Sequence, residues 1–96
     1  MIPSTAPSAE VMASHLLAAV ARAAEEGRRT NLELLAEEVG LRRAEARRTL
    51  SALDRQGLID VVRMRPTLLG FAVGRGLEAR GLPSLRREAE TLRRVA

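Results

Sequence analysis

The chain has 96 residues, 46% of them hydrophobic, which suits a single domain with a modest core. It has no cysteine, one histidine and one aromatic residue, which excludes disulfides, zinc fingers and aromatic platforms for single-stranded nucleic acid. All sixteen basic side chains are arginine and the formal net charge is +4, which favours an anionic partner.

The first predicted helix follows a short tail. Residues 1–7 contain two prolines, a serine and a threonine and predict a loose segment. Ser8 is a suitable N-cap, and apolar residues recur at helical spacing from there to about Glu26. Gly27 then predicts the end of this helix.

The second predicted helix begins at a capping box. Thr30 and Glu33 have the spacing of a capping box. The Thr30 hydroxyl would accept from the Glu33 amide, and the Glu33 side chain would accept from the amide of Thr30. Gly40 should end this helix, because glycine adopts the left-handed conformation that such a stop requires. We expect Leu41, the next residue, to pack beneath the turn.

A third helix is predicted over about residues 43–56. Ala46, Leu50 and Leu53 recur at helical spacing and predict a buried face. The opposite face then carries Ala44, Arg47, Arg48, Ser51 and Arg55, with Arg43 on its flank.

The basic surplus of the chain begins at this third helix. Residues 1–39 hold three arginines and six glutamates, a net charge of −3. Residues 40–66 hold seven arginines and three acidic residues, a net charge of +4, and residues 67–96 add +3. Such a distribution is typical of a surface that contacts phosphate.

A hairpin and a further helix follow. Leu58–Val62 is rich in Ile and Val and predicts a strand, with Arg63–Arg65 as its tip or a short return strand. Thr67 is a suitable cap for residues 68–79, which we interpret as a helix, although three glycines also leave a buried strand open.

Residues 81–96 form the C-terminal segment, in which Gly81 and Pro83 break the chain and a final amphipathic helix is predicted after them. Ser84 is its expected N-cap, and its apolar stripe consists of Leu85, Ala89, Leu92 and Ala96. The stripe could fold back on its own domain or contact a second subunit. We favour a homodimer through Leu85, Ala89 and Leu92, because prokaryotic operators are often two-fold symmetric.

The pattern of residues 35–59 resembles a known family. Leu35-Ala36-Glu37-Glu38-Val39-Gly40-Leu41, the spacing Ala46-x3-Leu50-x2-Leu53 and Gly57-Leu58-Ile59 are similar to winged helix-turn-helix DNA-binding domains of bacterial transcriptional regulators, MarR-like and related. The resemblance implies a mainly α fold with a short β-hairpin over residues 8–80, followed by the extra C-terminal helix.

The resemblance also implies a site that binds double-stranded DNA. In this family the exposed face of the third helix reads base edges in the major groove. The implied DNA-binding residues are Arg42, Arg43, Ala44, Arg47, Arg48, Ser51, Arg63 and Arg65. Arginine can donate two hydrogen bonds to guanine, and a small side chain can contact a thymine methyl group. A solvated turn is an equal alternative for Arg63 and Arg65.

Two positions depart from the family pattern. Arg42 stands where a capping Ser or Thr is usual, and with Arg43 it opposes the helix dipole. The hairpin is also short, which argues for little wing contact with DNA. The alternatives are a protein-interaction module that binds an acidic partner and a DNA binder without sequence preference.

The remaining sequence features predict no enzyme and no cofactor. Gly74-Arg75-Gly76-Leu77-Glu78-Ala79 has the letters of a dinucleotide site but lacks the strands that such a site requires. The glutamates have neither a nucleophile nor a metal-binding partner. The absence of a long apolar run or a signal sequence predicts a cytoplasmic protein without membrane contact.

Overall fold

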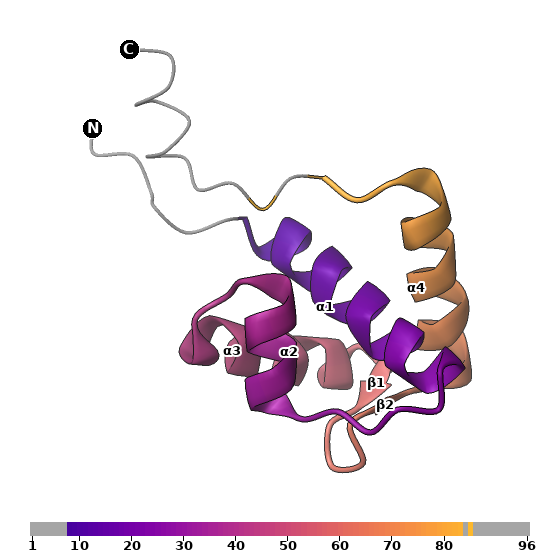
Figure 1. The fold of residues 1–96 in the computed structure, drawn as a ribbon, viewed down its shortest axis with the longest axis horizontal. Coiled ribbons are helices and arrows are strands. Elements are labelled where there is room, and N and C mark those ends of the chain that lie inside the picture. Colours follow the sequence, from indigo (N-terminus) through magenta and orange to yellow (C-terminus); the bar gives the residue numbers. More distant parts are fainter. Residues whose placement is uncertain (1–7, 84, 86–96) are drawn as a thin grey trace.

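The computed structural model describes residues 8–83 and 85. In this part of the chain it shows a mainly helical fold with one two-stranded antiparallel hairpin, as predicted (Figure 1). The elements are α1 (Ala9–Glu25), α2 (Leu32–Val39), α3 (Arg43–Arg55), β1 (Ile59–Asp60), β2 (Arg65–Pro66) and α4 (Leu68–Arg80).

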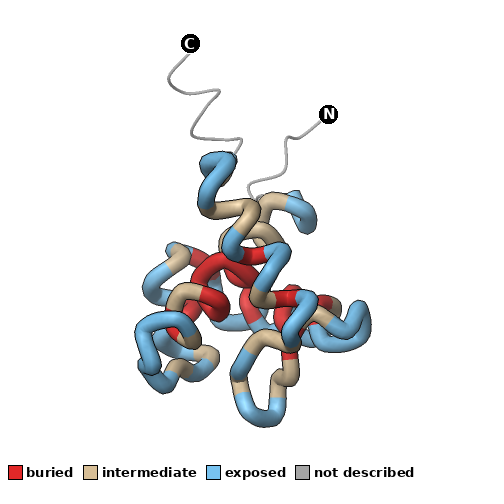
Figure 2. Tube along the Cα trace, turned by 90° about the vertical axis from the view of Figure 1, so that its right-hand side faces the viewer, coloured by how far each residue is buried: buried red, intermediate tan, exposed pale blue. Residues whose placement is uncertain are grey.

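Helix α1 is the central element of the fold. It begins at the predicted cap, where the Ser8 side chain accepts a hydrogen bond from the Val11 amide. Its residues 16–21 are all buried, because α2, α3 and α4 each pack against it (Figure 2). A helix that is apolar on every side requires such enclosure.

One side chain of α1 connects two of these neighbours. The Arg22 guanidinium donates to Glu38 on α2 at 2.9 Å and to Glu78 on α4 at 3.0 Å. The three side chains are each about one-third exposed, so the two ion pairs are only partly shielded from water. The two pairs link α2 and α4 to the same turn of α1.

The hydrophobic core lies between α1, α2, α3 and the start of the hairpin. The predicted inward residues of α3, Ala46, Leu50 and Leu53, are all buried in it. Leu41 is buried beneath the turn after α2, as expected. The other main contributors are Leu16, Leu17, Ala19, Val20, Leu35, Ala36 and Ile59.

Helix α2 begins one residue later than predicted. Asn31, not Thr30, is the N-cap, and its side chain accepts from the Leu34 amide at 2.9 Å. The capping box of Thr30 and Glu33 is therefore wrong. Asn is the stronger capping residue, and it occupies the position from which this bond can form. Gly40 ends the helix at φ 81°, in the predicted left-handed conformation.

This cap gives a direct test of the helix boundary. Asn31→Ala should lower the free energy of unfolding by about 1 kcal/mol, because the Leu34 amide loses its acceptor. Thr30→Ala is the matched control and should have a clearly smaller effect. Urea denaturation followed by circular dichroism measures both, and a larger loss for Thr30→Ala would contradict this boundary.

The hairpin is shorter than the predicted strand over residues 58–62. Only Ile59 and Asp60 pair, with Pro66 and Arg65 respectively. The Asp60 carboxylate accepts from the amides of residues 62 and 63, which turns the chain away from the strand. Met64 completes the turn with φ 52°, which is unusual for a residue other than glycine.

Helix α4 confirms the helical interpretation of residues 68–79. Thr67 caps it, accepting from the Gly70 amide at 3.0 Å. Gly70 and Gly74 permit close packing, since a Cβ at Gly70 would lie 1.6 Å from the Leu58 carbonyl oxygen. A Cβ at Gly74 would lie 2.8 Å from the Cβ of Ala21 on α1.

The chain turns back over α1 after α4. The His15 side chain hydrogen-bonds the carbonyl oxygen of Pro83, and Leu85 packs against the core. The rest of the predicted C-terminal helix, including its cap Ser84 and the stripe residues Ala89, Leu92 and Ala96, lies outside the described residues, as does the predicted tail 1–7.

Among the described residues, no helix is both long and apolar enough to cross a membrane.

Candidate nucleic-acid interface

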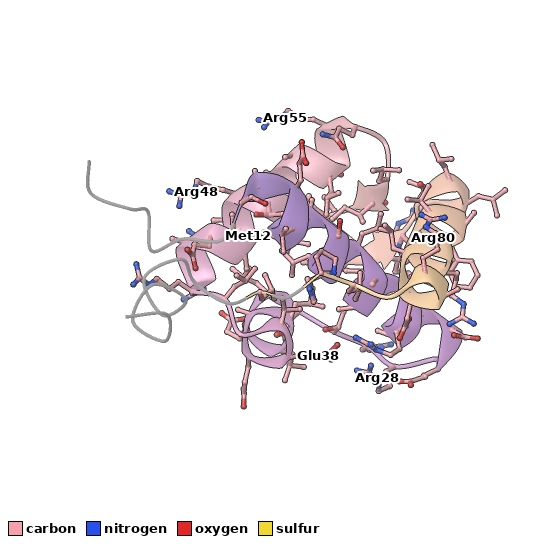
Figure 3. All side chains as sticks on the ribbon, turned by 90° about the horizontal axis from the view of Figure 1, so that it is seen from above. Met12, Arg28, Glu38, Arg48, Arg55 and Arg80 are labelled. Atoms are coloured by element: carbon pink, nitrogen blue, oxygen red, sulfur yellow. The ribbon has the colours of Figure 1, made fainter. Side chains whose placement is uncertain are left out.

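The outer face of α3 is a basic surface. Ala44, Arg47, Arg48 and Ser51 are all exposed, as the angular pattern predicted. The face opposite them is buried in the core, so α3 is held rigidly while these side chains stay in solvent. Figure 3 shows Arg48 and Arg55 extending outward from α3 on the same side.

The start of α3 is stabilised by Glu45 rather than by its N-cap. Arg42 is the N-cap, but a guanidinium has no acceptor for the orphan helix amides. The Glu45 carboxylate accepts from the Arg42 amide at 2.9 Å, which supplies the glutamate half of a capping box. This buried carboxylate also lies in the first turn, where a negative charge is favourable. Glu45 was not predicted as a capping residue, although its position three residues after Arg42 indicates the role.

Arg43 is partly engaged by the neighbouring helix. Its guanidinium lies 2.8 Å from the Glu33 carboxylate on α2, and both side chains are about 60% exposed. Ion pairs of this exposure contribute about 0–1 kcal/mol, so a phosphate could replace Glu33 at little cost. Arg42 itself is exposed beside this pair.

A second group of arginines surrounds a hollow between the hairpin and the α1–α2 connection. Arg63 and Arg65 line it from the hairpin, and Arg28 and Arg29 line it from the α1–α2 connection. Its volume is about 570 Å³, enough for a phosphate with its water shell. Arg28 and Arg29 were not among the predicted site residues. The doublet is visible in the sequence, but only the tertiary structure brings it to the hairpin.

The four arginines of this hollow differ in availability. Arg28 lies 2.6 Å from Glu26 and 3.9 Å from Glu38, and the hydrogen bond to Glu26 raises its pKa. Arg63 is 3.8 Å from Asp60 but is itself 80% exposed. Arg29 and Arg65 have no ion pair with any described residue. These last two are therefore the best placed to bind an external anion.

Comparison with protein-family models, with curated proteins and with solved structures found no match for this chain. Its functional interpretation therefore rests on the site itself. Guanidinium groups donate hydrogen bonds to phosphate oxygens and to guanine. In the part of the chain that the structure describes, no group of three or more His, Cys, Asp or Glu side chains could hold a metal ion.

Proposed function

We propose that this chain is a winged helix-turn-helix protein that binds double-stranded DNA sequence-specifically and regulates transcription. The observation that carries the proposal is the division of α3 into two faces. Ala46, Leu50 and Leu53 fix one face in the core, while Arg47 and Arg48 are presented to solvent on the other. A recognition helix needs one face packed firmly in the core and hydrogen-bond donors exposed on the opposite face.

Within this proposal the α3 face reads bases, and arginines at the start of α3 and around the hollow, Arg63 included, bind phosphates. Arg47 and Arg48 would donate to guanine in the major groove, and Ala44 would contact a thymine methyl group. Arg42 at the start of α3 and Arg65 at the hairpin would contact the backbone, which fixes the register of α3 on the duplex. Arg29 joins this second group because it lines the same hollow as Arg65.

Selection from a random duplex library by the full-length chain tests the proposal. We expect one enriched sequence, bound much more tightly than random duplex in competition. Four phosphate contacts, by Arg29, Arg42, Arg63 and Arg65, would give a slope of log affinity against log salt of about −3 to −4. Equal affinity for selected and random DNA would instead indicate binding without sequence preference. No binding to any duplex would favour the protein-interaction alternative.

A further inference from the structure

A second hollow adjoins the one that the arginines surround. It is lined by the hairpin and the first turn of α4, and its volume is about 550 Å³. The two hollows share Ala24, Arg63 and Arg65 in their walls, so they meet at the hairpin. We call them the arginine hollow and the Phe71 hollow, after the residues that distinguish them. Each has the size of a typical small-molecule site.

The arginine hollow has an excess of positive charge. Two of its four arginines, Arg28 and Arg63, lie near carboxylates of neighbouring residues. Arg29 and Arg65 have no ion pair with any described residue, so their positive charges are unbalanced. The end of α1 also borders the hollow, but its opposing dipole amounts to only about half a charge. The excess suits an anion with several negative charges, such as a di- or triphosphate.

The Phe71 hollow offers an apolar surface beside this charge. Phe71 is the only aromatic residue of the chain, and it lines the hollow together with Leu68 and Pro66. Phe71 is only half-buried, and a planar base can stack on such a ring. Asp60 lines the same hollow. Its Oδ1 accepts from backbone amides, whereas its Oδ2 lies 3.8 Å from Arg63 Nε, so Oδ2 can still accept from a sugar hydroxyl or a base amino group.

We propose that the two hollows together bind one nucleotide, a nucleoside di- or triphosphate. Its phosphates lie in the arginine hollow and its base lies against Phe71. The shared wall of Arg63 and Arg65 places the two parts side by side, as the phosphates and the base of one molecule require. An inorganic anion would leave the Phe71 hollow unused. The inference does not depend on DNA binding, but DNA offers the same phosphate chemistry, so a duplex and the nucleotide would compete for Arg29, Arg63 and Arg65.

Isothermal titration calorimetry of the full-length chain with ATP, in the absence of DNA, tests the site. We expect equimolar binding of ATP and weaker binding of inorganic triphosphate or adenosine, because each of these probes fills one hollow only. Arg29→Gln and Arg65→Gln should each weaken ATP binding about tenfold or more, since each removes a charged donor. Both side chains are exposed, so the fold should be retained. Arg80→Gln removes the same charge from a residue that lines neither hollow, and it should bind ATP like the natural chain.

Phe71→Leu separates the contribution of the base from that of the phosphates. It should weaken ATP binding about fivefold or more and leave the binding of inorganic triphosphate unchanged, because only stacking on the ring is lost. Absence of ATP binding would overturn the inference, even in a chain that binds DNA. So would ATP binding that Phe71→Leu leaves intact, or that Arg80→Gln weakens as much as Arg29→Gln. A chain that binds ATP as described but no duplex would support the inference and contradict the proposed function.

Discussion

Gly70→Ala should destabilise this protein more than any other single methyl group added to α4. The new Cβ would lie 1.6 Å from the Leu58 carbonyl oxygen and 2.6 Å from its carbonyl carbon. Both obstacles are backbone atoms, and the same oxygen accepts from the Thr67 amide, so neither side can yield without losing the α4 cap. We expect a loss of about 3 kcal/mol or more in the free energy of unfolding. Small domains have only about 5–15 kcal/mol in total.

Gly76→Ala is the matched control in the same helix. Its Cβ would meet only the end of the Arg80 side chain, at 3.5 Å. Alanine is the better helix former, so this variant should gain up to about 1 kcal/mol. Urea denaturation followed by circular dichroism gives both values. Similar stabilities for the two variants would show that α4 does not pack on Leu58 as closely as described.

Arg47→Ala and Arg48→Ala should produce the largest loss of DNA affinity. Each removes a bidentate donor from the outer face of α3, so each should weaken binding to the selected duplex by about 1–3 kcal/mol. Each should also relax the base preference at one position, because the variant lacks the donor that distinguishes guanine from the other bases there. Competition binding against single-base variants of the duplex measures both effects. Both residues are exposed, so the folded state should be retained.

Arg80→Ala controls for the loss of one positive charge. Arg80 is exposed on α4, and Figure 3 places it on the opposite side of the molecule from Arg48. We expect it to change affinity by much less and to leave base preference unaltered. If Arg47→Ala and Arg48→Ala behave like Arg80→Ala, then α3 does not read sequence and the proposed function fails.

The parts of this fold that local rules determine could be predicted from the sequence. The ends of α1 and α2 follow from Gly27 and Gly40, and the buried face of α3 follows from its helical spacing. The cap of α2 was wrong by one residue because Thr30 and Asn31 are both capping residues. Which of them caps depends on where the chain enters the helix, and Thr30 instead lines the hollow between the hairpin and the α1–α2 connection.

The parts that depend on distant contacts could not be predicted. The exposed residues of α3 follow from one helix, but the grouping of Arg29 with Arg65 requires the α1–α2 connection to meet the hairpin. The predicted dimer stripe at the C-terminus included Leu85, which packs on the core of its own domain. The glycines of α4 made its helical character hard to predict, because glycine is a poor helix former. Gly70 and Gly74 let Leu58 and α1 approach closely, a role that only the tertiary structure shows.

The double ion pair of Arg22 has a consequence for how motion spreads through this domain. One guanidinium on α1 holds Glu38, near the end of α2, and Glu78 on α4. A displacement of either helix along α1 moves the Arg22 guanidinium, to which the other helix is also bonded. Each bond is worth only about 1 kcal/mol at this exposure, so the link is soft. We therefore expect a shift of α4 along α1 to be felt at α2, the helix that precedes α3.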